Sequence, residues 1–185
     1  MPGRRDVELA MRGDHDAYAA LAAASADRLF SLARMILRDA DLAEDATQEA
    51  LVKAWRELPR LRDPDRFDAW LRRLLVNACY DETRRITRRA EVRSIPLAHP
   101  IVDGPAGRLA DRDRIDRGLR RIPVEQRAVL VLHHQLGLTH AEIAETLGVP
   151  LGTVKSRLRY GLESMRAAID ADDRSPSVVA EGRTA

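Results

Sequence analysis

Residues 139–159 read THAEIAETLGVPLGTVKSRLR, and this pattern predicts two short helices joined by a tight turn. Thr139 followed three positions later by Glu142 matches a capping box, which marks the start of a helix. Gly148 favours the left-handed conformation that ends such a helix. From Leu151 onward, apolar residues at every third or fourth position predict a second, longer helix. Two helices joined this closely must cross steeply, so the stretch is typical of a helix-turn-helix.

The second helix is expected to bury one apolar seam and to expose a basic face. The seam consists of Leu151, Val154, Leu158, Leu162, Met165 and Ile169. The helical period then turns six polar or aromatic residues outward or sideways: Thr153, Lys155, Ser156, Arg157, Arg159 and Tyr160. Because Arg and Lys donate to guanine edges and phosphates, this face is a candidate DNA reader. The alternative is an ordinary helical hairpin with a basic, solvent-facing surface.

The rest of the chain also has helical periodicity, so an all-α fold is expected. Hydrophobic residues make up 45% of the sequence but aromatic residues only 4%, which suits closely packed helices. Three stripes are visible upstream: Tyr18, Leu21, Ser25, Leu29, Leu32 and Ile36; Ala43, Ala46, Ala50 and Ala54, after a capping box at Asp41 and Glu44; and Phe67, Trp70, Leu71, Leu74 and Ala78. Pro59 and the Asp63-Pro64 pair predict a loop before the third stripe.

Proline and glycine between Ser94 and Gly107 predict a linker that separates two domains. Helical periodicity resumes near Ile115. After about Ala171 the chain is polar and lacks a period, and we expect that segment to be disordered.

Composition excludes several classes of protein. The net charge is only +2, because 31 basic residues nearly balance 29 acidic ones, so net charge alone does not indicate nucleic-acid binding. Cys79 is the single cysteine and cannot form an internal disulfide, and no apolar run is long enough for a signal core or a membrane span. We expect a cytoplasmic protein without membrane insertion. The histidines at 133, 134 and 140 lack a Cys cluster or a His-Glu-x-x-His pattern, so no metal site is expected. No phosphate-binding glycine loop, nucleophile elbow or paired-carboxylate signature occurs, so no cofactor or enzymatic activity is expected.

The chain resembles the ECF (extracytoplasmic function) RNA polymerase sigma factors of the sigma-70 superfamily. The run 152–157 closely resembles their recognition helix, and the segments 122–127 and 138–144 resemble the rest of their region 4. Residues 41–50, which lead to Ala54-Trp55, are similar to region 2.2, where five acidic residues occur between positions 39 and 49 without one Lys or Arg. Phe67-x-x-Trp70-Leu71, Asn77, Asp81 and Arg84-Arg85 follow regions 2.3 and 2.4.

The resemblance implies two small helical domains joined by a flexible linker. Region 2 would occupy residues 14–90, the linker 91–110, region 4 residues 111–170, and a disordered tail residues 171–185. Such a protein directs core RNA polymerase to promoters and assists DNA melting, and it catalyses no reaction itself. Its implied partners are the clamp and flap regions of polymerase, promoter DNA with −10 and −35 elements, and an anti-sigma factor.

The resemblance also assigns candidate residues to each partner. Asp45, Gln48 and Glu49 would bind core polymerase. The −10 element would be bound by Arg62, Asp65, Arg66, Asn77, Arg84 and Arg85, of which the first four are expected in or beside a loop that receives extruded bases. The −35 element would be read by the six outward residues of the second helix, Thr153, Lys155, Ser156, Arg157, Arg159 and Tyr160. Phe67 and Trp70 are expected to pack in the core rather than stack on bases.

Tyr160-Gly161 departs from the commonest family pattern, which has a basic residue followed by Ala. Gly161 is expected to loosen its helix by about 1 kcal/mol relative to Ala. Two other functions stay open on sequence alone. One is a helix-turn-helix activator or repressor with an N-terminal dimerisation or ligand-binding domain, and the other is a helical adaptor or anti-sigma-binding scaffold. An activator or repressor, unlike a sigma factor, needs no acidic face, no loop flanked by aromatic residues and no pattern from Asn77 to Arg85.

Overall fold

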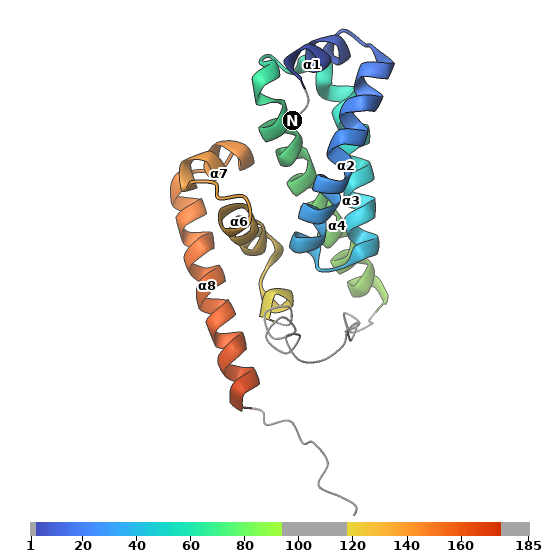
Figure 1. Cartoon of the computed structure of the whole chain (residues 1–185). Coiled ribbons are helices and arrows are strands. Elements are labelled where there is room, and N and C mark those ends of the chain that lie inside the picture. The colour runs from blue at the N-terminus through green and yellow to red at the C-terminus, as the bar shows by residue number, and fades with distance from the viewer. Residues whose placement is uncertain (1–2, 94–117, 175–185) are drawn as a thin grey trace, which may run out of the picture.

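The computed structural model describes residues 3–93 and 118–174, and within these ranges the secondary structure is helical without strands (Figure 1). The helices are α1 (Arg4–Met11), α2 (His15–Leu37), α3 (Ala40–Glu57), η1 (Leu58–Arg60), η2 (Pro64–Arg66), α4 (Phe67–Arg93), α6 (Val124–His134), α7 (His140–Leu147) and α8 (Leu151–Arg174). The elements from α1 to α4 form the N-terminal bundle, and α6 to α8 form the C-terminal bundle. No helix in the described ranges is long and apolar enough to cross a membrane.

The start of α3 differs from the sequence prediction. Its N-cap is Asp39, whose side chain accepts a hydrogen bond from the backbone N–H of Leu42 at 3.1 Å. The predicted cap, Asp41, already lies in the first helical turn. The reason is that α2 ends at Arg38 in the left-handed conformation (φ 60°), which leaves Asp39 extended. An N-cap must have such a non-helical backbone, so Asp39 takes the role.

The predicted alanine seam of α3 is confirmed. Ala43, Ala46, Ala50 and Ala54 are all fully buried, and α3 packs against both α2 and α4. Because alanine has a small side chain, the helix axes can approach closely along this seam. The opposite face of α3 is left exposed to solvent.

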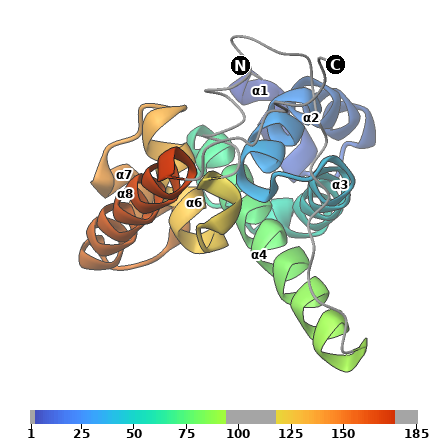
Figure 2. The same ribbon diagram turned by 90° about the horizontal axis from the view of Figure 1, so that it is seen from below.

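The predicted loop after α3 contains the two short 3-10 helices η1 and η2. Both ends of the loop are anchored in the core, because Leu58 is fully buried and Phe67 is 3% exposed. The stripe that continues from Phe67 through Leu71, Leu74 and Ala78 is buried as predicted. Helix α4 extends through residues 91–93, into the segment expected to be linker, and its far end projects away from the bundle (Figure 2). Residues 94–110 of that segment lie outside the described residues.

Helix α1 was not predicted. It places Val7 and Ala10 in the core, at 2% and 1% exposure. The spacing of these two residues supplies little more than one helical turn, which is too short for periodicity to identify a helix. The N-terminal bundle therefore begins before residue 14, the expected boundary.

The C-terminal bundle contains the predicted helix-turn-helix. Val129 to Leu132 of α6 are buried as expected. Helix α8 continues through Ala171 to Arg174, so the first four residues of the expected disordered tail are helical. Residues 175–185 lie outside the described residues.

The two bundles pack side by side and share one hydrophobic core (Figures 1 and 2). Helix α6 contacts α2 and α4, and α7 also contacts α4. From the C-terminal bundle, Val124, Val129, Leu132, Ile143, Leu147 and Val154 join the buried cluster of the N-terminal bundle. The structure thus presents a closed arrangement of the two bundles.

Candidate nucleic-acid and protein interfaces

The helix-turn-helix has the predicted local geometry. The Thr139 hydroxyl accepts a hydrogen bond from the backbone N–H of Glu142 at 3.3 Å, and the Glu142 carboxylate accepts one from the backbone N–H of Thr139 at 2.7 Å. The Thr139 hydroxyl also donates to Glu142 Oε2 at 2.7 Å, and this hydrogen bond, followed by the one from the Thr139 backbone, lowers the pKa of Glu142. Gly148 ends α7 in the left-handed conformation at φ 65°. The capping box and the turn glycine are therefore confirmed, and they fix the angle at which α8 leaves α7.

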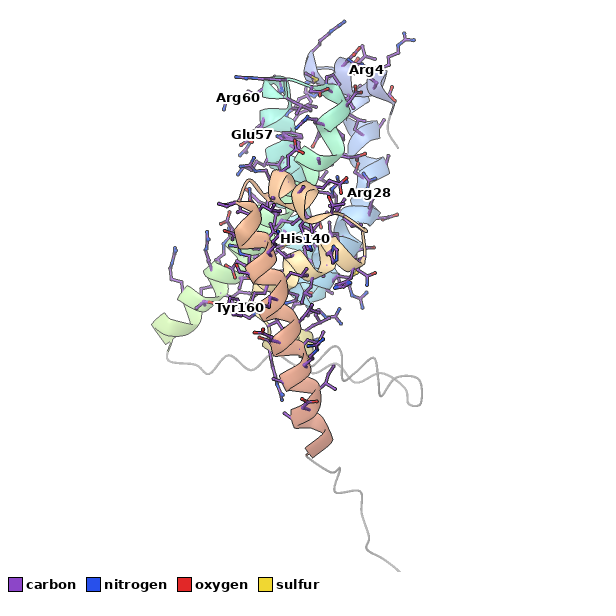
Figure 3. The ribbon with its side chains drawn as sticks, turned by 90° about the vertical axis from the view of Figure 1, so that its left-hand side faces the viewer. Arg4, Arg28, Glu57, Arg60, His140 and Tyr160 are labelled. Atoms are coloured by element: carbon purple, nitrogen blue, oxygen red, sulfur yellow. The ribbon has the colours of Figure 1, made fainter. Side chains whose placement is uncertain are left out.

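The six candidate residues on α8 are not equally accessible. Lys155, Arg159 and Tyr160 are exposed, whereas Thr153, Ser156 and Arg157 are half-buried. The Arg159 guanidinium lies over the Tyr160 ring, 4.6 Å from its centroid, and its Nε is 3.9 Å from Glu163 Oε1. Figure 3 shows Tyr160 on the outer side of α8. This part of α8 offers cationic groups and one aromatic ring to a partner.

Arg157 lies close enough to α4 for its charge to act on Tyr80. Burial raises the pKa of Tyr80 on α4 to about 12, and the charge of Arg157 acts against that rise. Ser156 donates a hydrogen bond to the carbonyl of Thr153 at 3.0 Å.

Of the six residues predicted for the apolar seam of α8, Val154 is buried, Leu158, Met165 and Ile169 are half-buried, and two are exposed. Leu151 and Leu162 are 43% and 37% exposed, while Gly161 and Ala168 are buried. Leu130 of α6 causes the shift at Gly161, because a Cβ at that glycine would lie 2.9 Å from Leu130 Cδ1. Gly161 thus permits close packing between α6 and α8, a role that helix propensity does not reveal.

The candidate −10 residues divide between a loop and a helix. Arg62, Asp65 and Arg66 are exposed on the loop, as expected. Asn77 does not lie beside that loop. It is half-buried on α4, roughly 15 Å along the axis from Phe67 at 1.5 Å per residue.

Asn77 instead shares a helix face with Asp81 and Arg84, which follow it by four and seven positions. The basic candidates at this end of α4 are exposed, and each is paired with a carboxylate. Arg84 Nη1 is 3.5 Å from Asp81 Oδ1, and Arg85 Nη1 is 2.8 Å from Oε1 of the buried Glu82. Salt bridges therefore already orient both arginines.

Phe67 and Trp70 belong to the packed part of the N-terminal bundle. Phe67 is 3% exposed, Trp70 is half-buried, and their ring centroids are 6.0 Å apart. Core packing of Phe67 is confirmed. Cys79 on the same helix is fully buried, and burial raises the pKa of its thiol to about 12, so it stays protonated at neutral pH.

The three candidate polymerase contacts share the exposed face of α3. Asp45, Gln48 and Glu49 all lie at the surface, and Gln48 Nε2 donates to Glu44 Oε1 at 3.3 Å. Val52 extends this face and is 45% exposed. Sequence reasoning missed Val52, although its spacing of three and four residues from Glu49 and Gln48 was the available signal. An acidic face with an exposed apolar residue suits a protein partner better than DNA.

One candidate residue of the loop takes part in the contact between the bundles, and the turn of the helix-turn-helix lies near it. Arg66 forms a salt bridge with Glu145 of α7. Gly148 lies directly beside Arg73 of α4, because a Cβ at that glycine would be 2.7 Å from Arg73 Nη2. In the closed arrangement, the turn of the helix-turn-helix therefore covers part of the surface next to the loop.

Both bundles match known sequence families. Residues 21–89 match the family described as Sigma-70 region 2, and residues 112–165 match Sigma-70, region 4. The ECF RNA polymerase sigma factor SigM of Mycobacterium tuberculosis is 36% identical over 159 residues, which cover 83% of this chain and 79% of that protein.

Solved structures share the arrangement of helices. The structure of CnrH in complex with the cytosolic domain of CnrY matches with a TM-score of 0.64 and 26% identity, covering 93% of this chain and 99% of that chain. The sigma factor RpoE of Bartonella quintana, in complex with the anti-sigma factor NepR, matches in fold with a TM-score of 0.68 and 24% identity. That match covers 84% of this chain and 98% of that chain.

Proposed function

Because the chain belongs to the ECF RNA polymerase sigma factors, we propose that it directs core RNA polymerase to specific promoters and assists DNA melting. One observation carries the proposal: a single chain combines an exposed acidic face on α3 with a basic, exposed helix-turn-helix on α8. The first surface suits a protein partner and the second suits DNA. Residues 14–90, together with α1, would act as region 2, and residues 111–170 as region 4.

In this proposal α8 enters the major groove at the −35 element, as the second helix of a helix-turn-helix does. Lys155 and Arg159 contact base edges or phosphates, and Tyr160 adds a flat apolar surface. Thr153 and Ser156 lie in the first turns of α8, where the helix N-terminus favours a phosphate. In the closed arrangement Arg157 lies near α4, so it becomes available to the DNA only when the bundles separate.

The loop of residues 58–66, hereafter the −10 loop, receives an extruded base in our proposal. Unstacking a base costs a few kcal/mol, which contacts from Arg62, Asp65 and Arg66 would offset. Arg84 and Arg85 would bind phosphates and supply affinity and salt dependence rather than sequence choice. Asn77 would contact the DNA from the side of α4 that it shares with Arg84.

Asp45, Gln48 and Glu49 would bind the polymerase clamp, with Val52 as an adjoining apolar contact on the same face. Region 4 would bind the flap. The protein would act in the cytoplasm with polymerase. An anti-sigma factor would control it, and CnrH, which is 26% identical, likewise binds a protein partner, the cytosolic domain of CnrY.

The closed arrangement cannot read both promoter elements at once. Their names place them about 25 base pairs apart, which is roughly 85 Å of duplex at 3.4 Å per base pair. We therefore propose that the bundles separate when polymerase binds. Separation would release Arg66 from Glu145 and make both candidate DNA surfaces available.

DNA footprinting with and without core polymerase discriminates this function from its alternatives. A sigma factor should protect the −10 and −35 elements of one promoter only when core polymerase is present. An activator or repressor would protect duplex DNA alone, usually as a dimer on a palindrome, and this result would refute the proposal. A helical adaptor would protect no DNA in either condition.

A further inference from the structure

Helix α1 borders the −10 loop. It packs against both η1 and η2, and its buried residues Val7 and Ala10 fix it to the core. Figure 3 shows Arg4 of α1 and Arg60 of the loop at the same end of the molecule. The first helix of the chain is therefore part of the surroundings of the loop.

Arg4 joins α1 to the loop through two carboxylates. Its Nε donates to Glu8 Oε1 at 2.9 Å, one turn further along α1, and its Nη1 donates to Asp65 Oδ2 in the loop. Glu8 thus holds the guanidinium in an orientation that faces Asp65. The Arg4 side chain remains 58% exposed, so it is accessible to a nucleic acid at the loop.

Asp65 is held at its backbone as well as at its carboxylate. The side chain of Asp63 accepts a hydrogen bond from the backbone N–H of Asp65 at 3.0 Å, while Arg4 binds the carboxylate. Asp65 lies between the buried ends of the loop, Leu58 and Phe67, but its own side chain is 62% exposed. Asp63 and Arg4 together fix the position of an exposed acidic group.

A carboxylate at a DNA site needs such a partner. Its charge is repelled by phosphates, and a bound arginine offsets this repulsion. An ionised carboxylate can only accept hydrogen bonds, so Oδ1 of Asp65 suits a base that carries an exocyclic amine, which adenine, cytosine and guanine have and thymine lacks. We propose that Arg4 is a positioning residue for −10 recognition, which holds the Asp65 carboxylate against the amine of an extruded base. This inference rests on the proposed function of the chain as a sigma factor.

The test measures binding of holoenzyme to the single-stranded −10 non-template strand of a promoter at which wild-type holoenzyme initiates. The variants are Arg4→Gln, Asp65→Asn and the double variant. Arg5→Gln is the matched control, because it removes the same charge from an exposed position of the same helix. Thermal melting of each variant reports folding. A second strand, with thymine at the extruded position, reports base discrimination.

We expect Arg4→Gln to weaken binding by about two- to fivefold, the range of an exposed ion pair, and to reduce discrimination against thymine. Arg5→Gln should retain both. Adding Arg4→Gln to Asp65→Asn should cause no further loss, since Arg4 acts through Asp65. Equal effects of Arg4→Gln and Arg5→Gln, or multiplied losses in the double variant, would overturn the inference while promoter initiation stays intact. If wild-type holoenzyme initiates at no promoter, the proposed function itself fails.

Discussion

Arg127 of α6 donates a hydrogen bond to the backbone carbonyl of Leu37 at 3.3 Å, across the boundary between the two bundles. Leu37 is the last residue of α2, where carbonyls lack partners within the helix and a positive charge is favourable. A second hydrogen bond joins Arg127 Nη2 to the carbonyl of Ile122 at 3.1 Å. One side chain of the C-terminal bundle therefore completes the end of a helix in the N-terminal bundle.

This contact is costly as well as favourable. Arg127 is 8% exposed, and burial lowers its pKa to about 10, with the charges of Arg38 and Arg120 acting in the same direction. The junction also contains a cavity of about 60 Å³ lined by Leu37, Thr83 and Arg127, among others. A buried charge beside incomplete packing makes the closed arrangement less stable than a fully apolar junction.

Arg127→Ala should shift the protein towards separated bundles. The substitution leaves the carbonyls of Leu37 and Ile122 without this donor and enlarges the cavity, which should destabilise the closed form by about 1–3 kcal/mol. Double electron–electron resonance between spin labels attached at Glu44→Cys and Arg166→Cys measures the separation of the bundles. The distances should be longer and more broadly distributed in the Arg127→Ala variant. Native Cys79 is buried and should not be labelled. Arg56→Ala, at an exposed position of α3, is the control, and an unchanged distance distribution in Arg127→Ala would contradict the prediction.

Gly161→Ala should destabilise the protein although alanine favours helices. Helix propensity would stabilise the variant by about 1 kcal/mol, but the contact of the new methyl group with Leu130 should cost about 1–3 kcal/mol. Denaturant unfolding measures the balance.

Gly152→Ala is the matched control for Gly161→Ala, because it lies in the same helix and a Cβ there meets nothing within 4 Å. It should increase the free energy of unfolding by about 0.5–1 kcal/mol. The prediction would be wrong if both substitutions stabilised the protein equally.

Lys155→Ala combined with Arg159→Ala should weaken binding of holoenzyme to the −35 element by about tenfold or more. Both residues are exposed, so stability should change little. Loss of phosphate contacts should also make the slope of log affinity against log salt concentration shallower by about one to two. Titrations of a −35 duplex at several salt concentrations measure both quantities, and binding to core polymerase should be retained. Arg166→Ala, which removes a positive charge from an exposed position further along the same helix, serves as control. Loss of polymerase binding in the double variant would show that it misfolds.

Gln48→Ala combined with Glu49→Ala should have the reverse effect. The variant loses polar groups from the exposed face of α3, so its affinity for core polymerase should fall by about tenfold. The surface of the helix-turn-helix is unchanged. Competition against labelled wild-type protein for core polymerase measures this loss. Asp27→Ala on the exposed surface of α2 removes a carboxylate elsewhere and should compete normally. If both variants compete equally well for core polymerase, α3 does not belong to the polymerase interface.

The sequence predicted features that depend on a few neighbouring residues. Thr139 with Glu142 starts α7 and Gly148 ends it, each by a local contact, so their pattern is sufficient to place the helix-turn-helix. The cap of α3 was misplaced by two residues because the left-handed turn at Arg38 decides which aspartate is extended. That turn has no signature in the sequence, since Arg rarely adopts a positive φ.

Features that depend on packing between distant segments could not be predicted. Arg127 would be expected at the surface, because arginine is rarely buried, and only the closed arrangement places it at the end of α2. Helix propensity alone marks Gly161 as destabilising for α8, and only the packing of Leu130 against it explains the glycine. Arg4 and Asp65 are separated by 61 positions, so neither residue indicates the other.

In the proposed function, this chain gives core polymerase its promoter specificity. The most direct measurement is transcription in vitro from genomic promoter fragments, with sigma-free core polymerase in the presence and absence of the protein. We predict transcripts with defined 5′ ends that need the protein and are lost when either the −10 or the −35 element is altered. The claim is contradicted if no fragment is transcribed while the protein alone protects a palindromic duplex.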